Sequence, residues 1–281
     1  MTAGPSALPD AQPSAQPSAQ PSAEPGAAPG SESAAAHRAD LGYQVKVETL
    51  SVGGVALQIC SLLDRQQYSD PTGSAARAGI TDTDWPLFGM VWPSSQVLAE
   101  AMLGIELGDR RVLEVGCGLA LASLVVQRRG GNITASDKHP LAGRFLSDNL
   151  RLNGLAPLRF VTSDWDVDER GPGAPTGNAL GMFELIIGSD VLYERQQPEA
   201  LARFIEAHSC DDMEVLIADP DRGNRNAFTR QMQRFGFVYS EQKVARLPGG
   251  QAYKGRLIRY RRSARPAASA QATVAGLAAA P

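Results

Sequence analysis

Residues 111–137 read RVLEVGCGLALASLVVQRRGGNITASD, and this stretch decides the fold. The apolar run 111–115 has the length of a buried strand, and residues 116–118 then provide a tight Gly-x-Gly turn. Residues 119–129 predict a helix that ends in two arginines ahead of a glycine pair, which suits the helix dipole and a glycine C-terminus. A second strand is predicted over 133–137. This order indicates a βαβ unit with two parallel strands.

The same alternation continues on both sides of this unit. Further strands are predicted over 158–162, 183–189, 213–218, 237–245 and 252–260, and further helices over 93–102, 140–153, 198–208 and 224–235. The segment between the last two strands is too short for a parallel crossover, so they are expected to pair antiparallel. We therefore expect an α/β fold: a doubly wound, mostly parallel seven-stranded sheet with an antiparallel final strand. The alternating pattern over residues 43–59 predicts a β-hairpin ahead of the first helix.

A basic cluster near the end of the chain lies on the last predicted strand and comprises Arg256, Arg259, Arg261 and Arg262. We expect this reversed strand to end the sheet as a solvated edge, where charged side chains prevent strand-to-strand aggregation. Binding of an acidic substrate protein is the alternative interpretation.

The aromatic residues mark the part of the chain that can build a core. All of them lie between Tyr43 and Tyr260, whereas residues 11–26 repeat a tetrapeptide of small and polar residues with proline at its third place. Such a segment has too little apolar surface to repay the entropy of ordering. We therefore predict a disordered Pro/Ala/Ser-rich leader over residues 1–40, one domain over 41–262 and a disordered Ala-rich tail over 263–281.

Charge and cysteine content exclude several classes of protein. The net charge is −3 and the middle of the chain is nearly neutral, so the basic surface required for non-specific nucleic-acid binding is missing. No apolar run reaches the length of a membrane span, which is about 18 residues. A disulfide framework and a metal site are not expected, because the cysteines and histidines are few and scattered, at positions 60, 117 and 210 and at 37, 139 and 208. We expect a cytoplasmic protein with no membrane or nucleic-acid partner.

The glycine turn and the acid that ends the next strand predict a nucleoside cofactor. Gly116 and Gly118 let a ligand approach the backbone, and Asp137 lies where a carboxylate can accept both hydroxyls of a ribose. A dinucleotide fingerprint would need glycine or alanine where Leu121 stands, which weakens that interpretation. The alternative is that these glycines merely turn the chain.

Five motifs in this order carry a resemblance to a known family: WPSS at 92–95, EVGCG at 114–118, the acid Asp137, SDW at 163–165 and SDVLYE at 189–194. Together they resemble the class I S-adenosylmethionine-dependent methyltransferases with a Rossmann-like sheet. More narrowly, they resemble the methyltransferase-16 group of protein-lysine methyltransferases and nicotinamide N-methyltransferase-like proteins. The resemblance covers about residues 43–262.

The resemblance implies S-adenosyl-L-methionine as cofactor and assigns nine residues to it: Trp92, Glu114, Gly116, Cys117, Gly118, Asp137, Asp164, Trp165 and Ser189. The glycine turn would line the methionine part, with Glu114 setting the turn and reaching the amino group through water. Asp137 would hold the ribose, and the SDW pair would meet the adenine. Trp92 would close the site, and Ser189 would lie beneath the cofactor. From the residues alone, the two tryptophans could equally be core residues, and Asp164 a turn residue.

Asp190 and Tyr193 are the expected catalytic residues, because they follow a predicted strand at its carboxyl end. Asp190 would accept hydrogen bonds from an acceptor amine, and Tyr193 would provide an aromatic wall near its positive charge. Asp219 and Arg222 are weaker candidates on the substrate side. The expected activity is methylation of a side-chain nitrogen, lysine, of a protein substrate. A small-molecule N-methyltransferase and a non-catalytic cofactor-binding module remain alternatives, and the sequence does not determine the oligomeric state.

Overall fold

The computed structural model describes residues 42–165 and 180–263, together with Met1 and Gly4. The leader predicted for residues 1–40 and the tail predicted for 263–281 lie outside the described residues, apart from Met1, Gly4 and Ser263. The disordered leader and the disordered tail therefore stay predictions, as do the domain bounds 41–262.

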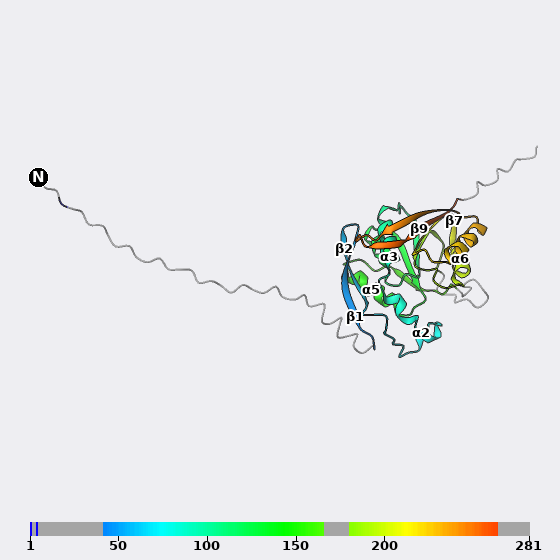
Figure 1. Ribbon diagram of the computed structural model, residues 1–281, viewed down its shortest axis with the longest axis horizontal. Coiled ribbons are helices and arrows are strands. Elements are labelled where there is room, and N and C mark those ends of the chain that lie inside the picture. The colour runs from blue at the N-terminus through cyan, green and yellow to red at the C-terminus, as the bar shows by residue number, and fades with distance from the viewer. Residues whose placement is uncertain (2–3, 5–41, 166–179, 264–281) are drawn as a thin grey trace, which may run out of the picture. The chain divides into compact units, whose positions relative to one another are not determined.

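A seven-stranded sheet runs through the described part of the chain in the spatial order β5-β4-β3-β6-β7-β9-β8. Its strands β7 and β9, which lie side by side, are labelled in Figure 1. Strands β3 to β7 are mutually parallel, whereas β9 is antiparallel to both β7 and β8. The predicted sheet with its reversed final strand is thus confirmed. The strands are β3 (Arg111–Val115), β4 (Asn132–Asp137), β5 (Arg159–Thr162), β6 (Phe183–Ser189), β7 (Ser209–Asp219), β8 (Val238–Arg246) and β9 (Ala252–Arg262).

A separate antiparallel hairpin of β1 (Val45–Val52) and β2 (Val55–Leu62) precedes the sheet, as predicted. The longer helices also agree with prediction: α3 (Pro93–Gly104), α4 (Leu121–Arg128), α5 (Ala142–Leu152), α6 (Gln197–Ala207) and α7 (Arg225–Arg234). Sequence periodicity missed α2 (Ser74–Arg77) and the 3-10 helix η2 (Trp85–Gly89), which are too short to show a helical repeat. Within residues 42–165 and 180–263, no helix has the length and apolar character that crossing a bilayer requires.

Alternate residues of the central strands pack on opposite faces of the sheet. On β6, Leu185 and Ile187 join a hydrophobic cluster with residues of α3, α4, α5 and the hairpin, whereas Ile186 joins a second cluster with residues of α6 and α7. Both faces of the sheet are therefore covered, which is why its strands are continuous apolar runs in the sequence. This double packing holds the carboxyl ends of the parallel strands together at one end of the sheet.

The arginine-rich strand is not the edge of the sheet, so that prediction is wrong. β9 lies between β7 and β8, and β8 forms the edge. The β9 arginines contact carboxylates of neighbouring elements instead of bulk solvent alone: Arg259 pairs with Glu214 at 3.0 Å, and Arg256 pairs with Asp221 and Glu241 at 2.9 and 2.6 Å. A tight connection between β8 and β9 is compatible with either strand next to β7, so local sequence pattern does not decide the order.

We expect a chain truncated to residues 40–262 to melt within a few degrees of the full chain, because neither terminal segment has enough apolar content to repay its ordering entropy. Thermal unfolding of both chains, followed by circular dichroism, checks this expectation. A large drop in melting temperature on truncation would mean that a terminal segment packs on the domain.

Candidate functional site

The residues that the sequence assigned to a site converge on one cavity of about 290 Å³ at the carboxyl ends of the parallel strands. Ligands bind at this end of open α/β sheets. Glu114 is fully buried and does not line the cavity. The other ten predicted residues do line it: Trp92, Gly116, Cys117, Gly118, Asp137, Asp164, Trp165, Ser189, Asp190 and Tyr193.

The glycine turn follows β3 directly, and its backbone conformation favours glycine at both positions. Gly116 and Gly118 adopt left-handed φ angles of +56° and +51°. A Cβ on Gly116 would lie 2.9 Å from Val191 Cγ1, and one on Gly118 would lie 2.9 Å from the carbonyl oxygen of Phe88. Between the glycines, burial raises the pKa of the Cys117 thiol. That thiol therefore stays protonated at neutral pH, which agrees with a packing role and not with a nucleophile.

Asp137 ends β4 and supports the glycine turn. Its Oδ2 accepts a hydrogen bond from the Gly118 amide at 2.9 Å, and its Oδ1 accepts one from the His139 amide at 2.8 Å. Burial raises the pKa of Asp137, and these two hydrogen bonds oppose the rise. Each carboxylate oxygen accepts more than one donor, so Asp137 can also bind hydroxyl groups of a ligand in the cavity that it lines.

Glu114 is buried near the end of β3 and stabilises the start of α4. Its Oε2 accepts hydrogen bonds from the backbone amide of Ser123, at 2.8 Å, and from the Ser123 hydroxyl. Burial raises the pKa of Glu114 to about 7, against the effect of these hydrogen bonds. These bonds join β3 to α4 across the turn, and the predicted role of Glu114 in setting the turn stays a prediction. The position of Glu114 gives no support to the predicted contact with the amino group of a cofactor, because Glu114 is absent from the cavity lining.

Aromatic rings enclose the cavity, and the sequence identified only some of them. The Trp92 indole donates a hydrogen bond to the Leu87 carbonyl at 2.8 Å, which fixes its ring in the segment before α3. Phe88 and His139 also line the cavity, with their rings stacked at a centroid distance of 3.7 Å. The sequence signal for this pair was weak, because an isolated histidine two residues after Asp137 matches no motif.

Two buried polar atoms of residues that line this cavity lack a partner within the described residues: Nε2 of His139 and Oγ of Ser163. The Nδ1 of His139 accepts a hydrogen bond from the Leu141 amide at 3.2 Å, so the proton of the neutral ring belongs on Nε2. Burial lowers the pKa of His139 to about 3, which keeps the ring neutral at pH 7. Buried polar atoms are rarely unpaired, so these two are available to bond to a molecule in the cavity that they line.

Asp190 and Tyr193 follow β6 and lie at the same cavity. The Asp190 side chain is only 9% exposed, and its backbone adopts a φ of +57°, a left-handed conformation that is uncommon outside glycine and is often found at functional sites. Partial burial raises the pKa of Tyr193 to about 12, so its hydroxyl stays protonated. Of the two weaker candidates, Arg222 lines the cavity, whereas Asp219 is fully buried at the end of β7 and does not line it.

Replacing Asp137 by alanine is expected to weaken cofactor binding about 10- to 100-fold, since a hydrogen bond to a charged group contributes about 1.5–3 kcal/mol. The substitution also removes the bonds to the Gly118 and His139 amides, which loosens the turn. Equilibrium dialysis with labelled cofactor measures the effect. Asp212→Ala is the matched control, because it removes an exposed carboxylate away from the cavity. Equal affinity in the Asp137 and Asp212 variants would exclude Asp137 from the binding site.

Comparisons with known proteins identify relatives of this chain. The sequence model of a family described as "Lysine methyltransferase" matches residues 83–235. Electron transfer flavoprotein beta subunit lysine methyltransferase of Danio rerio is 28% identical over 142 residues, which cover 49% of this chain and 51% of that protein. Protein N-lysine methyltransferase METTL21A of Danio rerio is 31% identical over 162 residues, which cover 54% of this chain and 72% of that protein.

A solved structure supports the fold at lower sequence identity. The T. Thermophilus 16S rRNA N2 G1207 methyltransferase RsmC, in complex with AdoMet and guanosine, superposes with a TM-score of 0.50 and 16% identity over 79% of this chain and 51% of that chain. This likeness concerns the fold alone. In sequence, the chain spans about half the length of the flavoprotein-modifying relative that it matches.

Proposed function

The chain belongs to the lysine methyltransferase family, and from this premise we propose that it transfers a methyl group from S-adenosyl-L-methionine to the side-chain amine of a lysine in a protein substrate. One observation carries the proposal: a single cavity is lined both by the glycine turn with Asp137 and by Asp190 with Tyr193. A site for a nucleoside cofactor therefore adjoins residues suited to bind an amine.

The residues present fit this cofactor. The glycine turn exposes backbone where any side chain would collide with Phe88 or Val191, and Asp137 offers a carboxylate for the ribose hydroxyls. The unpaired Nε2 of His139 and Oγ of Ser163 offer a buried donor and a buried hydroxyl. When bound, S-adenosyl-L-methionine supplies an electrophilic methyl group on a sulfonium sulfur. Trp92 and Trp165 line the same cavity and help to exclude water from it.

The protein's own contribution to the transfer is to bind, orient and desolvate the acceptor amine. A lysine amine has an ordinary pKa of about 10.4 and must release a proton to solvent before it can act as a nucleophile, which a partly apolar cavity favours. As the nitrogen bonds to the methyl carbon, the carbon–sulfur bond breaks and the sulfur leaves in a neutral thioether. The Asp190 carboxylate accepts a hydrogen bond from that amine and thereby directs its lone pair. The Tyr193 ring stabilises the positive charge nearby. Correct positioning within a water-poor site accounts for the acceleration, without a covalent intermediate.

The test is to incubate the purified full chain with label-donating S-adenosyl-L-methionine and the lysate of a strain that lacks this protein. The proposal predicts label in a protein band, on lysine, and a labelling rate about 100-fold lower with Asp190→Asn in place of the wild type. Label confined to the small-molecule fraction would replace the proposal with a small-molecule N-methyltransferase. Cofactor binding without transfer to any fraction would replace it with a non-catalytic binding module.

A further inference from the structure

The carboxylate of Asp190 is held by an arginine of the turn that follows β7, the neighbouring strand of the sheet. The Nε of Arg222 donates a hydrogen bond to Oδ1 of Asp190 at 2.8 Å. Asp190 follows β6 and Arg222 follows β7, so the two residues are far apart in sequence. Both nevertheless line the same cavity. Within residues 42–165 and 180–263, this bond from Arg222 is the side-chain contact that holds the Asp190 carboxylate.

The backbone of Asp190 is fixed independently of this ion pair. Its amide donates a hydrogen bond to the carbonyl of Ala218 at 2.9 Å, and its left-handed φ of +57° departs from the extended conformation of the preceding strand. The main chain therefore determines where the side chain starts. The remaining freedom lies in the side-chain torsions of Asp190, and a charge-assisted hydrogen bond from Arg222 restricts those.

The backbone of Arg222 is itself anchored to the end of β7. Its amide donates to Oδ1 of the fully buried Asp219 at 2.8 Å. The intervening Asp221 adopts a left-handed φ of +62° and pairs with Arg256 of β9 at 2.9 Å and with Arg225 of α7 at 3.5 Å. The turn that carries Arg222 is thus tied to two neighbouring elements.

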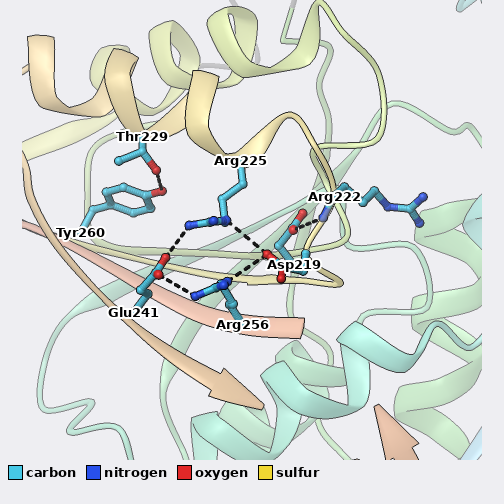
Figure 2. A network of polar contacts seen from close by, with 8 residues as sticks. Asp219, Arg222, Arg225, Thr229, Glu241, Arg256 and Tyr260 are labelled. Atoms are coloured by element: carbon cyan, nitrogen blue, oxygen red, sulfur yellow. Dashed lines mark hydrogen bonds and ion pairs between the residues drawn. The ribbon is translucent and has the colours of Figure 1, made fainter. Parts of the chain in front are cut away.

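A ring of four charged residues completes this anchor. Arg225 and Arg256 each pair with both Asp221 and Glu241, so that α7, β8, β9 and the turn after β7 are joined (Figure 2). Figure 2 also shows that the Arg222 side chain leads away from this ring, while its backbone lies beside Asp219. The anchor therefore holds the backbone of Arg222 and leaves its guanidinium available to Asp190.

We propose that Arg222 is a positioning residue, which fixes the Asp190 carboxylate in the orientation that receives the acceptor amine. The inference rests on the proposed function, in which Asp190 accepts a hydrogen bond from the acceptor amine. One carboxylate oxygen binds Arg222 Nε, and the other is directed to the substrate. The guanidinium also offsets part of the carboxylate's negative charge, so Asp190 favours the protonated form of a bound lysine less than an unpaired carboxylate would.

The pair differs from an ordinary surface ion pair in two respects. Exposed ion pairs contribute little, because solvent screens them and both side chains move. Here the Asp190 side chain is only 9% exposed, although Arg222 is 42% exposed, and both flanking backbones are held by the contacts described above. Hydrogen bonding to Asp190 also raises the pKa of Arg222, so the guanidinium keeps its charge.

The kinetic test compares Arg222→Gln and Arg222→Lys with Arg203→Gln, which removes an exposed arginine of α6 that pairs with Glu199. We expect Arg222→Gln to lower turnover about 10- to 100-fold, the scale of a misoriented reacting group, with cofactor affinity unchanged. Arg222→Lys keeps the charge without the planar donor and should recover part of the loss. In a protein that already carries Asp190→Asn, Arg222→Gln should lower turnover little further, because the two residues act through one interaction. Equal losses in both backgrounds, or full turnover by Arg222→Gln, would overturn the inference.

A second measurement does not depend on activity. The Nε–H proton of Arg222, assigned by its loss in Arg222→Gln, is followed by nuclear magnetic resonance in the full chain with and without S-adenosyl-L-methionine. We expect this proton to exchange with solvent at least about 10-fold more slowly than the Nε–H proton of Arg203, which is the ratio that a hydrogen bond to a charged group implies. In Asp190→Asn, this protection from exchange should be lost. Exchange as fast as that of Arg203 would overturn the inference. Protection in a protein that transfers no methyl group would instead show that the proposed function has failed.

Discussion

Asp190→Asn should lower the rate of methyl transfer about 100-fold or more, which is the scale of a positioned proton-accepting group, while cofactor affinity stays near that of the wild type. The carboxylate follows β6 and is bonded to Arg222, whereas the glycine turn and Asp137 follow β3 and β4. Binding and catalysis are therefore expected to separate. Single-turnover methyl transfer, measured alongside cofactor titration, checks both quantities.

Asp212→Asn is the matched control, because it makes the same chemical change on an exposed part of β7. In addition, Tyr193→Phe should lower the rate of methyl transfer less than Tyr193→Ala does, if the ring contributes to the transfer and the hydroxyl does not. Full turnover by Asp190→Asn would remove this residue from the mechanism and leave geometry and desolvation as the whole source of the acceleration. Parallel loss of cofactor affinity would assign Asp190 to the cofactor site.

Gly118→Val should abolish cofactor binding. The φ of +51° is unfavourable for valine, and its Cβ would lie 2.9 Å from the Phe88 carbonyl oxygen, so the turn must shift. That shift would also disturb the hydrogen bond from the Gly118 amide to Asp137. Equilibrium dialysis with labelled cofactor measures binding, and thermal unfolding confirms that the variant is folded.

Gly104→Val controls for the added side chain. Gly104 lies at the end of α3, and a Cβ there would meet no atom within 4 Å. We expect this control to bind cofactor as the wild type does. A folded Gly118→Val variant that also binds normally would contradict the assignment of the cofactor to the glycine turn.

The sequence predicted the sheet and its helices well, because their signals are local. The run RVLEVGCG contains an apolar strand and a glycine turn, and the structure places β3 and left-handed glycines at those positions. The apolar positions of β6 were also clear, although its residues divide between two clusters. A strand buried on both faces still reads as one apolar run.

The order of the last strands was not predictable in the same way. Whether β8 or β9 pairs with β7 depends on contacts between residues far apart in sequence, such as Arg259 with Glu214. The arginines of β9 therefore resembled those of a solvated edge, although they are paired with carboxylates of the protein.

The candidate site was predicted from short motifs, and its gaps have a common cause. Ten residues from these motifs line one cavity, but His139 and Phe88 carry no motif and meet only through the packing of η2 on the end of β4. The sequence could not show that Glu114 lies outside the cavity lining, because its bond to Ser123 of α4 depends on how the strand and the helix pack. The sequence signal for Arg222 was weak, because its bond to Asp190 joins two segments that follow different strands.

A calorimetric titration of S-adenosyl-L-methionine into the wild-type full chain tests the central claim most directly, namely that the glycine turn and Asp137 build a cofactor site. We expect a saturable heat corresponding to one molecule of cofactor per chain, and we expect that heat to be lost in Gly118→Val. Absence of saturable binding by a wild-type protein shown to be folded would contradict the assignment of the cofactor, and with it the proposed methyl transfer.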